Sequence, residues 1–158
     1  MTENTHIYVP GTGNPYAKIV IVGEAPGDHE TIQKKPFVGP SGKFLDDLLT
    51  EVGINRNNCW VTNVFKSKIP PNPKEGKKIP AAVRAANIGI DVKQSIDELR
   101  IELNQINPNL IIALGGTALW ALTGRKDIQA MRGSITTGMG YKTIATYHPA
   151  HILHNEGD

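Results

Sequence analysis

The sequence predicts an α/β fold, a three-layer α/β/α domain built on a four-stranded parallel sheet. Four short runs rich in β-branched residues alternate along the chain with stretches of helical periodicity. Such alternation is typical of parallel sheets that helices cover on both faces. The chain has 158 residues, of which 39% are hydrophobic, and this suffices for one domain with its own core. We therefore expect a single domain over residues 1–158.

The first half of the chain contains two of the predicted strands. Residues 18–23 are a β-branched run closed by glycine, which indicates a buried parallel strand. A loop rich in glycine and proline follows over residues 24–42. Ser41 suits the N-cap of a helix that ends near Gly53, because apolar side chains recur between them at helical spacing. Residues 59–63 are expected to form the second strand.

The second half of the chain continues the alternation. Residues 69–80 hold four prolines and a glycine and indicate a loop, whose last proline suits the start of a helix. An isoleucine and leucine stripe over residues 96–106 predicts a further helix. Residues 110–114 are the third strand, from which a Gly-Gly turn leads into a short helix. Residues 142–146 are the fourth strand.

Four segments that are polar or rich in glycine follow the ends of these strands. They are Gly-Glu-Ala-Pro-Gly at residues 23–27, Asn63, the glycine pair at residues 115–116, and His148. In an open parallel sheet the ligand binds outside the carboxyl ends of the strands. The sequence therefore predicts a binding site at which these four segments meet.

Several other classes of site lack their motifs. The chain has no Gly-x-Gly-x-x-Gly fingerprint, no P-loop and no Gly-x-Ser-x-Gly elbow, which argues against a nucleotide cofactor or a serine hydrolase. His148, His151 and His154 are spaced by three residues, but without a carboxylate or cysteine motif beside them we expect no metal site. The single cysteine, Cys59, excludes a disulfide within the chain. No apolar run approaches the roughly 18–20 residues of a membrane span.

The positive charge of the chain is concentrated in one short segment. The whole chain carries 17 basic and 15 acidic side chains, a net charge of +2. Residues 66–78 alone hold five lysines and one glutamate, which gives +4. Charge alone leaves two interpretations open, a solvated loop and a loop that binds phosphates.

Four motifs occur in a fixed order and resemble those of a known family. They are Gly-Glu-Ala-Pro-Gly at residues 23–27, Lys-Pro-Phe-Val-Gly at 35–39, Val-Thr-Asn-Val-Phe-Lys at 61–66 and Ala-Thr-Tyr-His-Pro-Ala at 145–150. The set resembles the uracil-DNA glycosylase superfamily, most of all its family 4, usually iron–sulfur proteins of bacteria and archaea. The resemblance implies a monofunctional DNA glycosylase of base excision repair, which hydrolyses the N-glycosidic bond of a flipped-out deoxyuridine.

The resemblance gives roles to three side chains. Phe37 is placed like the family's stacking phenylalanine, Asn63 like the asparagine that reads uracil O4 and N3, and His148 like the histidine that offers a donor to O2. Each has a structural alternative: a core aromatic, a turn cap and a hydrogen-bonded structural histidine, respectively. The implied uracil-binding residues are Gly23, Glu24, Ala25, Gly27, Phe37, Asn63 and His148.

Two positions depart from the best-known branch of the superfamily. Gly27 stands where that branch has a tyrosine that excludes the thymine methyl group, and Ala25 where it has a water-activating aspartate. A methyl group cannot polarise water, so a carboxylate nearby or the electrostatics of the pocket must serve. Glu24, Asp28 and Glu30 are the candidates, although the last two have the alternative of solvated loop charges. The expected catalytic residues are His148, Glu24, Asn63, Asp28 and Glu30.

Two further departures concern the cluster and the end of the chain. Family 4 enzymes usually hold the cluster on four cysteines, whereas this chain has Ser67 and, near the fourth position, Ser95, with no cysteine near its N-terminus. Cys59 matches none of these positions, so we expect no iron–sulfur cluster and no other cofactor. Family members continue past the His-Pro motif with a further helix. The chain is therefore expected to be either a minimal, truncated fold or part of a longer polypeptide.

Uracil-containing DNA is the expected partner. Basic side chains and the helix start at Ser41 suit phosphates. Ile152 and Leu153 are candidates for an apolar wedge at the flipped base, with helix packing as the alternative. The expected DNA contacts are Ser41, Lys43, Lys66, Lys68, Asn72, Lys74, Ile152 and Leu153, together with Lys77 and Lys78.

A second function remains open on the sequence alone, a non-catalytic module that binds DNA or a replication protein. The alanine at position 25 and the missing cluster cysteines favour it. For either function we expect a cytoplasmic monomer without membrane contact, with replication or repair proteins as further partners.

Overall fold

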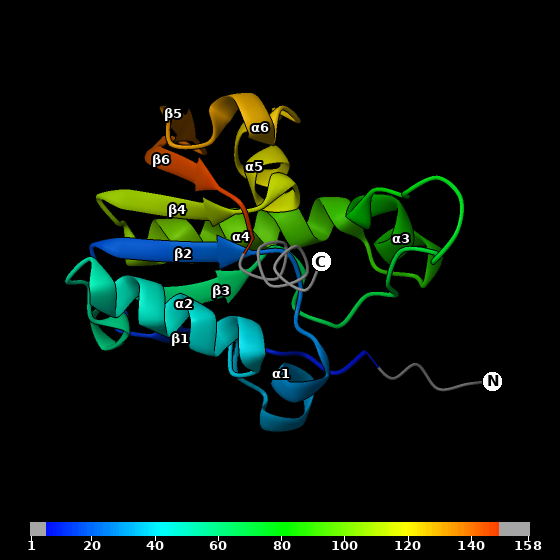
Figure 1. The fold of residues 1–158 in the computed structure, drawn as a ribbon, viewed down its shortest axis with the longest axis horizontal. Helices are drawn as coiled ribbons and strands as arrows, with labels where there is room; N and C mark the ends of the chain where they lie inside the picture. Colours follow the sequence, from blue (N-terminus) through cyan, green and yellow to red (C-terminus); the bar gives the residue numbers. More distant parts are fainter. Residues whose placement is uncertain (1–5, 149–158) are drawn as a thin grey trace.

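The computed structural model describes residues 6–148 of the chain. Its centre is a six-stranded sheet with the order β1-β3-β2-β4-β6-β5 (Figure 1). The strands β3, β2, β4 and β6 are parallel, and β1 and β5 join the two edges antiparallel. The predicted α/β class is confirmed, and the sheet has two strands more than the sequence predicted.

The four parallel strands lie where the sequence predicts them. They are β2 (Ile19–Gly23), β3 (Trp60–Asn63), β4 (Leu110–Leu114) and β6 (Tyr141–Thr146). The two edge strands, β1 (Thr12–Gly13) and β5 (Ile135–Gly138), have no clear pattern in the sequence. In β1 the backbone approaches its partner so closely that a Cβ atom on Gly13 would lie 2.1 Å from the Cys59 carbonyl oxygen.

Four helices also correspond to the prediction. They are α2 (Pro40–Glu51), α3 (Ala81–Asn87), α4 (Val92–Ile106) and α5 (Gly116–Thr123). Three short segments were not predicted: α1 (Asp28–Gln33), the 3₁₀ turn η1 (Arg56–Asn58) and α6 (Ile128–Met131). None exceeds six residues, which is too short for a helical period to be recognised. The predicted loop over residues 24–42 therefore contains a helix, α1.

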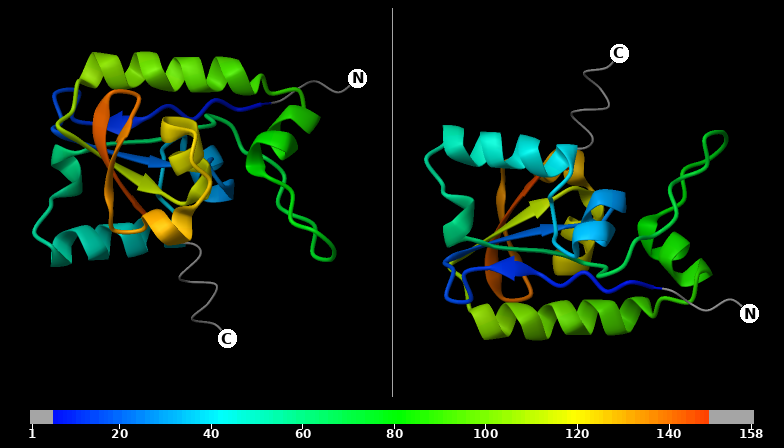
Figure 2. Two further views of the ribbon diagram at one scale, coloured as in Figure 1. Left: turned by 90° about the horizontal axis from the view of Figure 1, so that it is seen from above. Right: turned by 90° about the horizontal axis from the view of Figure 1, so that it is seen from below.

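Helices cover both faces of the sheet, with α4 in yellow-green and α2 in cyan on opposite sides (Figure 2). Alternate side chains of β2 point to opposite faces, as the pleat of a strand requires. Val20 packs in one buried cluster with Leu99 of α4, while Ile21 packs in another with Leu45 and Leu49 of α2. The three-layer arrangement is thus confirmed. Because the four central strands are parallel, their carboxyl ends lie on one side of the sheet.

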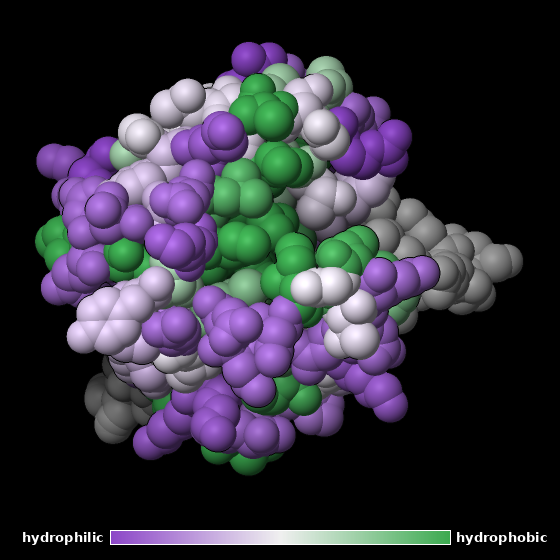
Figure 3. Space-filling view, turned by 90° about the vertical axis from the view of Figure 1, so that its left-hand side faces the viewer, coloured by the Kyte–Doolittle hydropathy of each residue, from purple (hydrophilic) through white to green (hydrophobic). Residues whose placement is uncertain are grey.

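Seen from the side on which β2 and β4 begin, the surface shows a band of apolar side chains bordered by hydrophilic ones (Figure 3). Ile112, Ile144 and Ile135 are register neighbours on β4, β6 and β5, and the first two are only half-buried. Within residues 6–148, no helix has the length and apolar character that crossing a membrane would require.

Candidate active site

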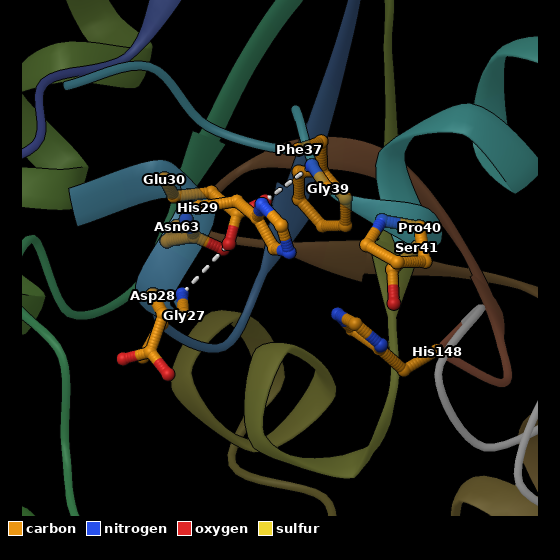
Figure 4. Close-up of a pocket in the computed structure, with 11 residues that line it drawn as sticks. Gly27, Asp28, His29, Glu30, Phe37, Gly39, Pro40, Ser41, Asn63 and His148 are labelled. Atoms are coloured by element: carbon orange, nitrogen blue, oxygen red, sulfur yellow. Dashed lines mark hydrogen bonds between the residues drawn. The ribbon is translucent and has the colours of Figure 1, made fainter. Parts of the chain in front are cut away.

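The loops at the carboxyl ends of the strands enclose a pocket of about 310 Å³ (Figure 4). Four segments form its walls: the loop after β2 with α1, the loop before α2, the end of β3, and His148 beyond β6. The lining residues are Ala25, Gly27, Asp28, His29, Glu30, Phe37, Gly39, Pro40, Ser41, Asn63 and His148. The structure thus brings together Phe37, Asn63 and His148, which lie far apart in the sequence.

Phe37 forms one wall of the pocket with a backbone in the left-handed region, at a φ of +52°. Few non-glycine residues adopt this conformation, and it persists only where the surroundings impose it. Arg56 supplies part of that support, since it donates to the carbonyl oxygens of Phe37 and Pro36, each at 2.6 Å. The same guanidinium donates to Asp46 at 3.0 Å. The buried Phe37 ring lies with its centroid 5.4 Å from that of the His148 ring.

Asn63 ends β3 with a side chain that is buried beside the pocket. The residue is 2% exposed, and within the described part of the chain its Oδ1 atom has no hydrogen-bond partner. A buried polar atom without a partner is rare in proteins, and here a ligand in the pocket would supply one. Gly23 makes the space, because a Cβ atom there would lie 2.6 Å from Oδ1 and 2.5 Å from Cζ of Phe37. An amide in this place can donate and accept hydrogen bonds at once.

His148 lies across the pocket from Phe37, against Gly115 at the start of α5. A Cβ atom on Gly115, whose φ is +94°, would lie 3.2 Å from the Cβ of His148. Burial lowers the pKa of His148 below its usual value, and the negative charges of Glu24 and Glu30 offset part of that change. The imidazole is therefore neutral at pH 7 and has one N–H group to donate.

The lowered pKa of His148 gives the protein a defined dependence of stability on pH. The unfolded chain binds the proton first, so the free energy of unfolding decreases as the pH falls below 6.5, the ordinary value. We expect this decrease to be steeper in the native protein than in His148→Gln, where the titrating group is gone. Urea denaturation at a series of pH values measures both slopes. Equal slopes would contradict the prediction.

Glu30 organises the loop that carries Phe37. Its Oε1 atom accepts a hydrogen bond from the Gly27 amide at 2.9 Å, and its Oε2 atom accepts from the Val38 and Gly39 amides at 3.0 and 2.8 Å. Burial raises the pKa of this carboxyl, but these backbone donors outweigh burial, and the pKa lies below its usual value. Glu30 is thus an ionised group fixed in the pocket wall, in contrast to the alternative of a solvated loop charge.

The other two candidate carboxylates lie farther from the centre of the pocket. Glu24 faces a neighbouring cavity, where it accepts a hydrogen bond from Thr117 at 2.6 Å and lies 3.8 Å from Arg84. Its side chain does not line the pocket that holds Phe37 and Asn63, although the family resemblance implies that Glu24 binds uracil. Asp28 does line this pocket, at the rim, and is 77% exposed. Its hydrogen bond with Lys68 lowers the pKa of Asp28.

Lys66, one of the expected DNA contacts, is buried in the protein. Its side chain is only 8% exposed, its ammonium group lies 2.9 Å from the Glu102 carboxylate of α4, and it donates to the Asn63 carbonyl oxygen. Glu102 also accepts hydrogen bonds from Trp60 at 2.8 Å and Thr62 at 3.2 Å. This burial contradicts the expectation that Lys66 contacts DNA phosphates, because the charge is already compensated inside the protein.

The remaining expected DNA contacts are placed as follows. Lys68, Lys74, Lys77 and Lys78 are exposed, and Lys68 pairs with Asp28 at the pocket rim. Ser41 lines the pocket in the first turn of α2, where Lys43 is exposed. Asn72 holds its own loop, because its Oδ1 atom accepts a hydrogen bond from the Ile79 amide at 2.7 Å. The wedge candidates Ile152 and Leu153, like His151 and His154, lie outside the described residues.

The residues present do not fit an iron–sulfur cluster held on four cysteines. The chain has one cysteine, Cys59, which is buried, and Ser95 uses its hydroxyl to donate to the Asp91 carbonyl oxygen at 3.0 Å. Among residues 6–148 no group of three or more histidine, cysteine, aspartate or glutamate side chains is arranged to hold a metal ion. A direct hydrogen bond connects the N-terminal segment to the end of the motif at residues 61–66. The Val9 amide donates to the Lys66 carbonyl oxygen at 2.6 Å.

The fold, the four motifs and the pocket together define a class of protein. The model of the uracil DNA glycosylase superfamily matches residues 10–158, and the chain belongs to this superfamily. The resemblance to family 4 is confirmed by two relatives of that type. The chain is 36% identical over 156 residues to the type-4 uracil-DNA glycosylase of Archaeoglobus fulgidus, covering 93% of this chain and 72% of that protein. It is 37% identical over 153 residues to that of Thermotoga maritima, covering 95% and 73%.

A third relative has a different name. The DNA polymerase of Bacillus phage SP01 is 32% identical to this chain over 144 residues, which cover 90% of this chain but 14% of the polymerase. Part of a much longer viral protein is therefore similar to nearly the whole of this one.

Proposed function

We propose that this protein is a monofunctional uracil-DNA glycosylase, which hydrolyses the N-glycosidic bond of a flipped-out deoxyuridine in DNA. The observation that carries the proposal is the pocket itself. An aromatic ring, a buried amide oxygen that has no hydrogen-bond partner among residues 6–148, and a neutral imidazole meet there, at Phe37, Asn63 and His148. The similarity to two type-4 uracil-DNA glycosylases, which extends over more than nine-tenths of this chain at 36% and 37% identity, supports it.

The three side chains suit the shape and polarity of uracil. The Phe37 ring offers a flat apolar surface on which a base can stack. The Asn63 amide can accept from uracil N3–H and donate to O4, whereas cytosine presents the opposite polarity at both atoms. A pocket of about 310 Å³ has the volume for one base. Pairing of the Asn63 oxygen with a ligand would also remove the energetic cost of burying it alone.

The chemistry consists of one bond broken and one bond formed. The bond between C1′ and N1 breaks with its electron pair on the base, water adds to C1′, and the water proton leaves to solvent. The neutral His148 donates its N–H group to O2 of the departing uracil anion, which stabilises the negative charge where it develops. The ionised Glu30 lies in the same pocket and favours the positive charge that develops on the sugar.

Phosphates on both sides of the flipped nucleotide would be bound by exposed basic residues. Lys68, Lys74, Lys77 and Lys78 lie on the segment that follows Asn63, and Ser41 and Lys43 lie at the start of α2. We propose that the protein acts as a monomer without an iron–sulfur cluster. Since its substrate is DNA, we place its action in the cytoplasm of a prokaryotic or phage-infected cell, beside replication or repair proteins.

Oligonucleotides with one deoxyuridine, single-stranded and paired with guanine or adenine, test the proposal directly. The expected result is an alkali-labile abasic site at the uracil position and release of free uracil. Matched oligonucleotides with thymine or cytosine at that position should stay intact. Folded protein that cleaves none of the uracil substrates would contradict the proposal.

The second candidate is a non-catalytic module that binds DNA or a replication protein. The similarity to a segment of a phage DNA polymerase favours it, as does Ala25, whose methyl side chain offers no polar atom to a water in the pocket. Tight binding of uracil-containing DNA without release of the base would support this function, and base release would exclude it.

A further inference from the structure

A single arginine connects the two ends of the loop that carries three of the exposed lysines. This basic loop, residues 69–80, holds three lysines and one glutamate, a net charge of +2. Arg84 of α3 donates from Nη1 to the Pro70 carbonyl oxygen at 2.6 Å and from Nε to the Ile79 carbonyl oxygen at 2.9 Å. Since Pro70 and Ile79 lie at the two ends of the loop, one guanidinium holds both of them.

The same guanidinium also faces the catalytic end of the sheet. Its Nη2 atom lies 3.8 Å from the Glu24 carboxylate, which in turn accepts a hydrogen bond from Thr117 at the start of α5. The Arg84 side chain is only 11% exposed, so these contacts are shielded from solvent. The planar fork of arginine can serve three acceptors in fixed directions, whereas a lysine ammonium offers no such plane.

The cavity beside these contacts adjoins the base pocket. It has a volume of about 530 Å³, and Glu24, Asn72, Arg84 and Thr117 are among the residues that line it. Ala25 and His148 line both this cavity and the base pocket. The basic loop projects from the same side of the molecule as the carboxyl ends of the parallel strands, at the right of Figure 1.

We propose that Arg84 is a positioning residue for DNA binding, which holds the basic loop at a fixed place beside the base pocket. The proposal deepens the function proposed above and rests on it for the identity of the ligand. Because both ends of the loop are already fixed, the loop that carries Lys74, Lys77 and Lys78 loses less conformational entropy when DNA binds. Without Arg84, the loop must be ordered anew at each encounter, so DNA affinity falls while the chemistry within the pocket remains.

The variants Arg84→Gln, Arg84→Lys and, as a matched control, Arg100→Gln on the exposed face of α4 test this role. Amide hydrogen exchange of the non-proline residues among 70–80 reports how well the loop is held in place. This exchange should accelerate in Arg84→Gln. The dissociation constant for duplex DNA should rise about tenfold, the effect of losing one to two phosphate contacts, and its dependence on salt should weaken. The single-turnover rate at saturating protein should change less than threefold. Arg84→Lys should show exchange and affinity between those of Arg84→Gln and the native protein, and Arg100→Gln should match the native protein.

Two results would overturn the proposal: unchanged exchange and affinity in Arg84→Gln, or an equal loss of affinity and single-turnover rate. If Arg84→Gln does not fold, Asn72→Ala removes the hydrogen bond within the loop, and unchanged affinity and exchange there would refute the proposal equally. Exchange and affinity are measured with DNA that contains no uracil as well as with DNA that does. If the protein has no glycosylase activity, the proposed function is contradicted. The exchange and affinity measurements still decide the role of Arg84.

Discussion

Asn63→Ala should lower uracil excision by about 100- to 1,000-fold, the range found when a hydrogen-bonding group that acts in the transition state is removed. The same change should leave the free energy of unfolding within about 1 kcal/mol of the native value. An unpaired buried oxygen costs about 1–3 kcal/mol, and removing it offsets the packing lost with the amide. A large loss of activity at nearly constant stability is characteristic of a residue kept for its ligand.

Single-turnover excision and urea denaturation, carried out on the same preparations, measure the two quantities. Asn58→Ala, at an exposed position of η1, is a suitable control and should retain both activity and stability. A strongly destabilised Asn63→Ala would show that the amide is a turn cap, which is the structural alternative for this residue. Native activity in that variant would remove Asn63 from the proposed mechanism.

The strands that form the site could be predicted because their signal is local. Each parallel strand is a short run rich in apolar and β-branched residues that ends at, or is followed by, glycine, asparagine or threonine, and parallel order brings their ends to one side. The edge strands β1 and β5 gave no such signal. β1 is only two residues long, and half of β5 is solvent-exposed, so neither shows an apolar run.

Three charged residues show what local patterns leave out. Lys66 lies in a lysine-rich segment and therefore resembles a solvated cation, but its partner Glu102 comes from a helix 36 positions later. Arg56 and Arg84 were missed for a different reason, since their main acceptors are backbone carbonyl oxygens. A carbonyl is present at every residue, so no sequence motif distinguishes the ones that an arginine will bind.

Gly42→Ala should damage the site through the backbone of Phe37. A Cβ atom on Gly42 would lie 1.9 Å from the Phe37 carbonyl oxygen and 2.2 Å from its carbonyl carbon. Glycine to alanine inside a helix ordinarily stabilises by about 1 kcal/mol, but overpacking of this severity costs about 1–3 kcal/mol or more. We therefore expect a net loss of stability of about 2 kcal/mol, the opposite of what helix propensity alone would give.

Activity should fall further than stability in Gly42→Ala, because the atom displaced is the one that Arg56 holds at 2.6 Å. Moving it releases Phe37 from its left-handed conformation and shifts the ring on which the base stacks, with an expected loss of about 100-fold in excision. Asp47→Ala, on the exposed part of the same helix, should change neither quantity. Gly42→Ala with native activity would mean that the Phe37 backbone tolerates displacement, and that stacking does not depend on the Arg56 support.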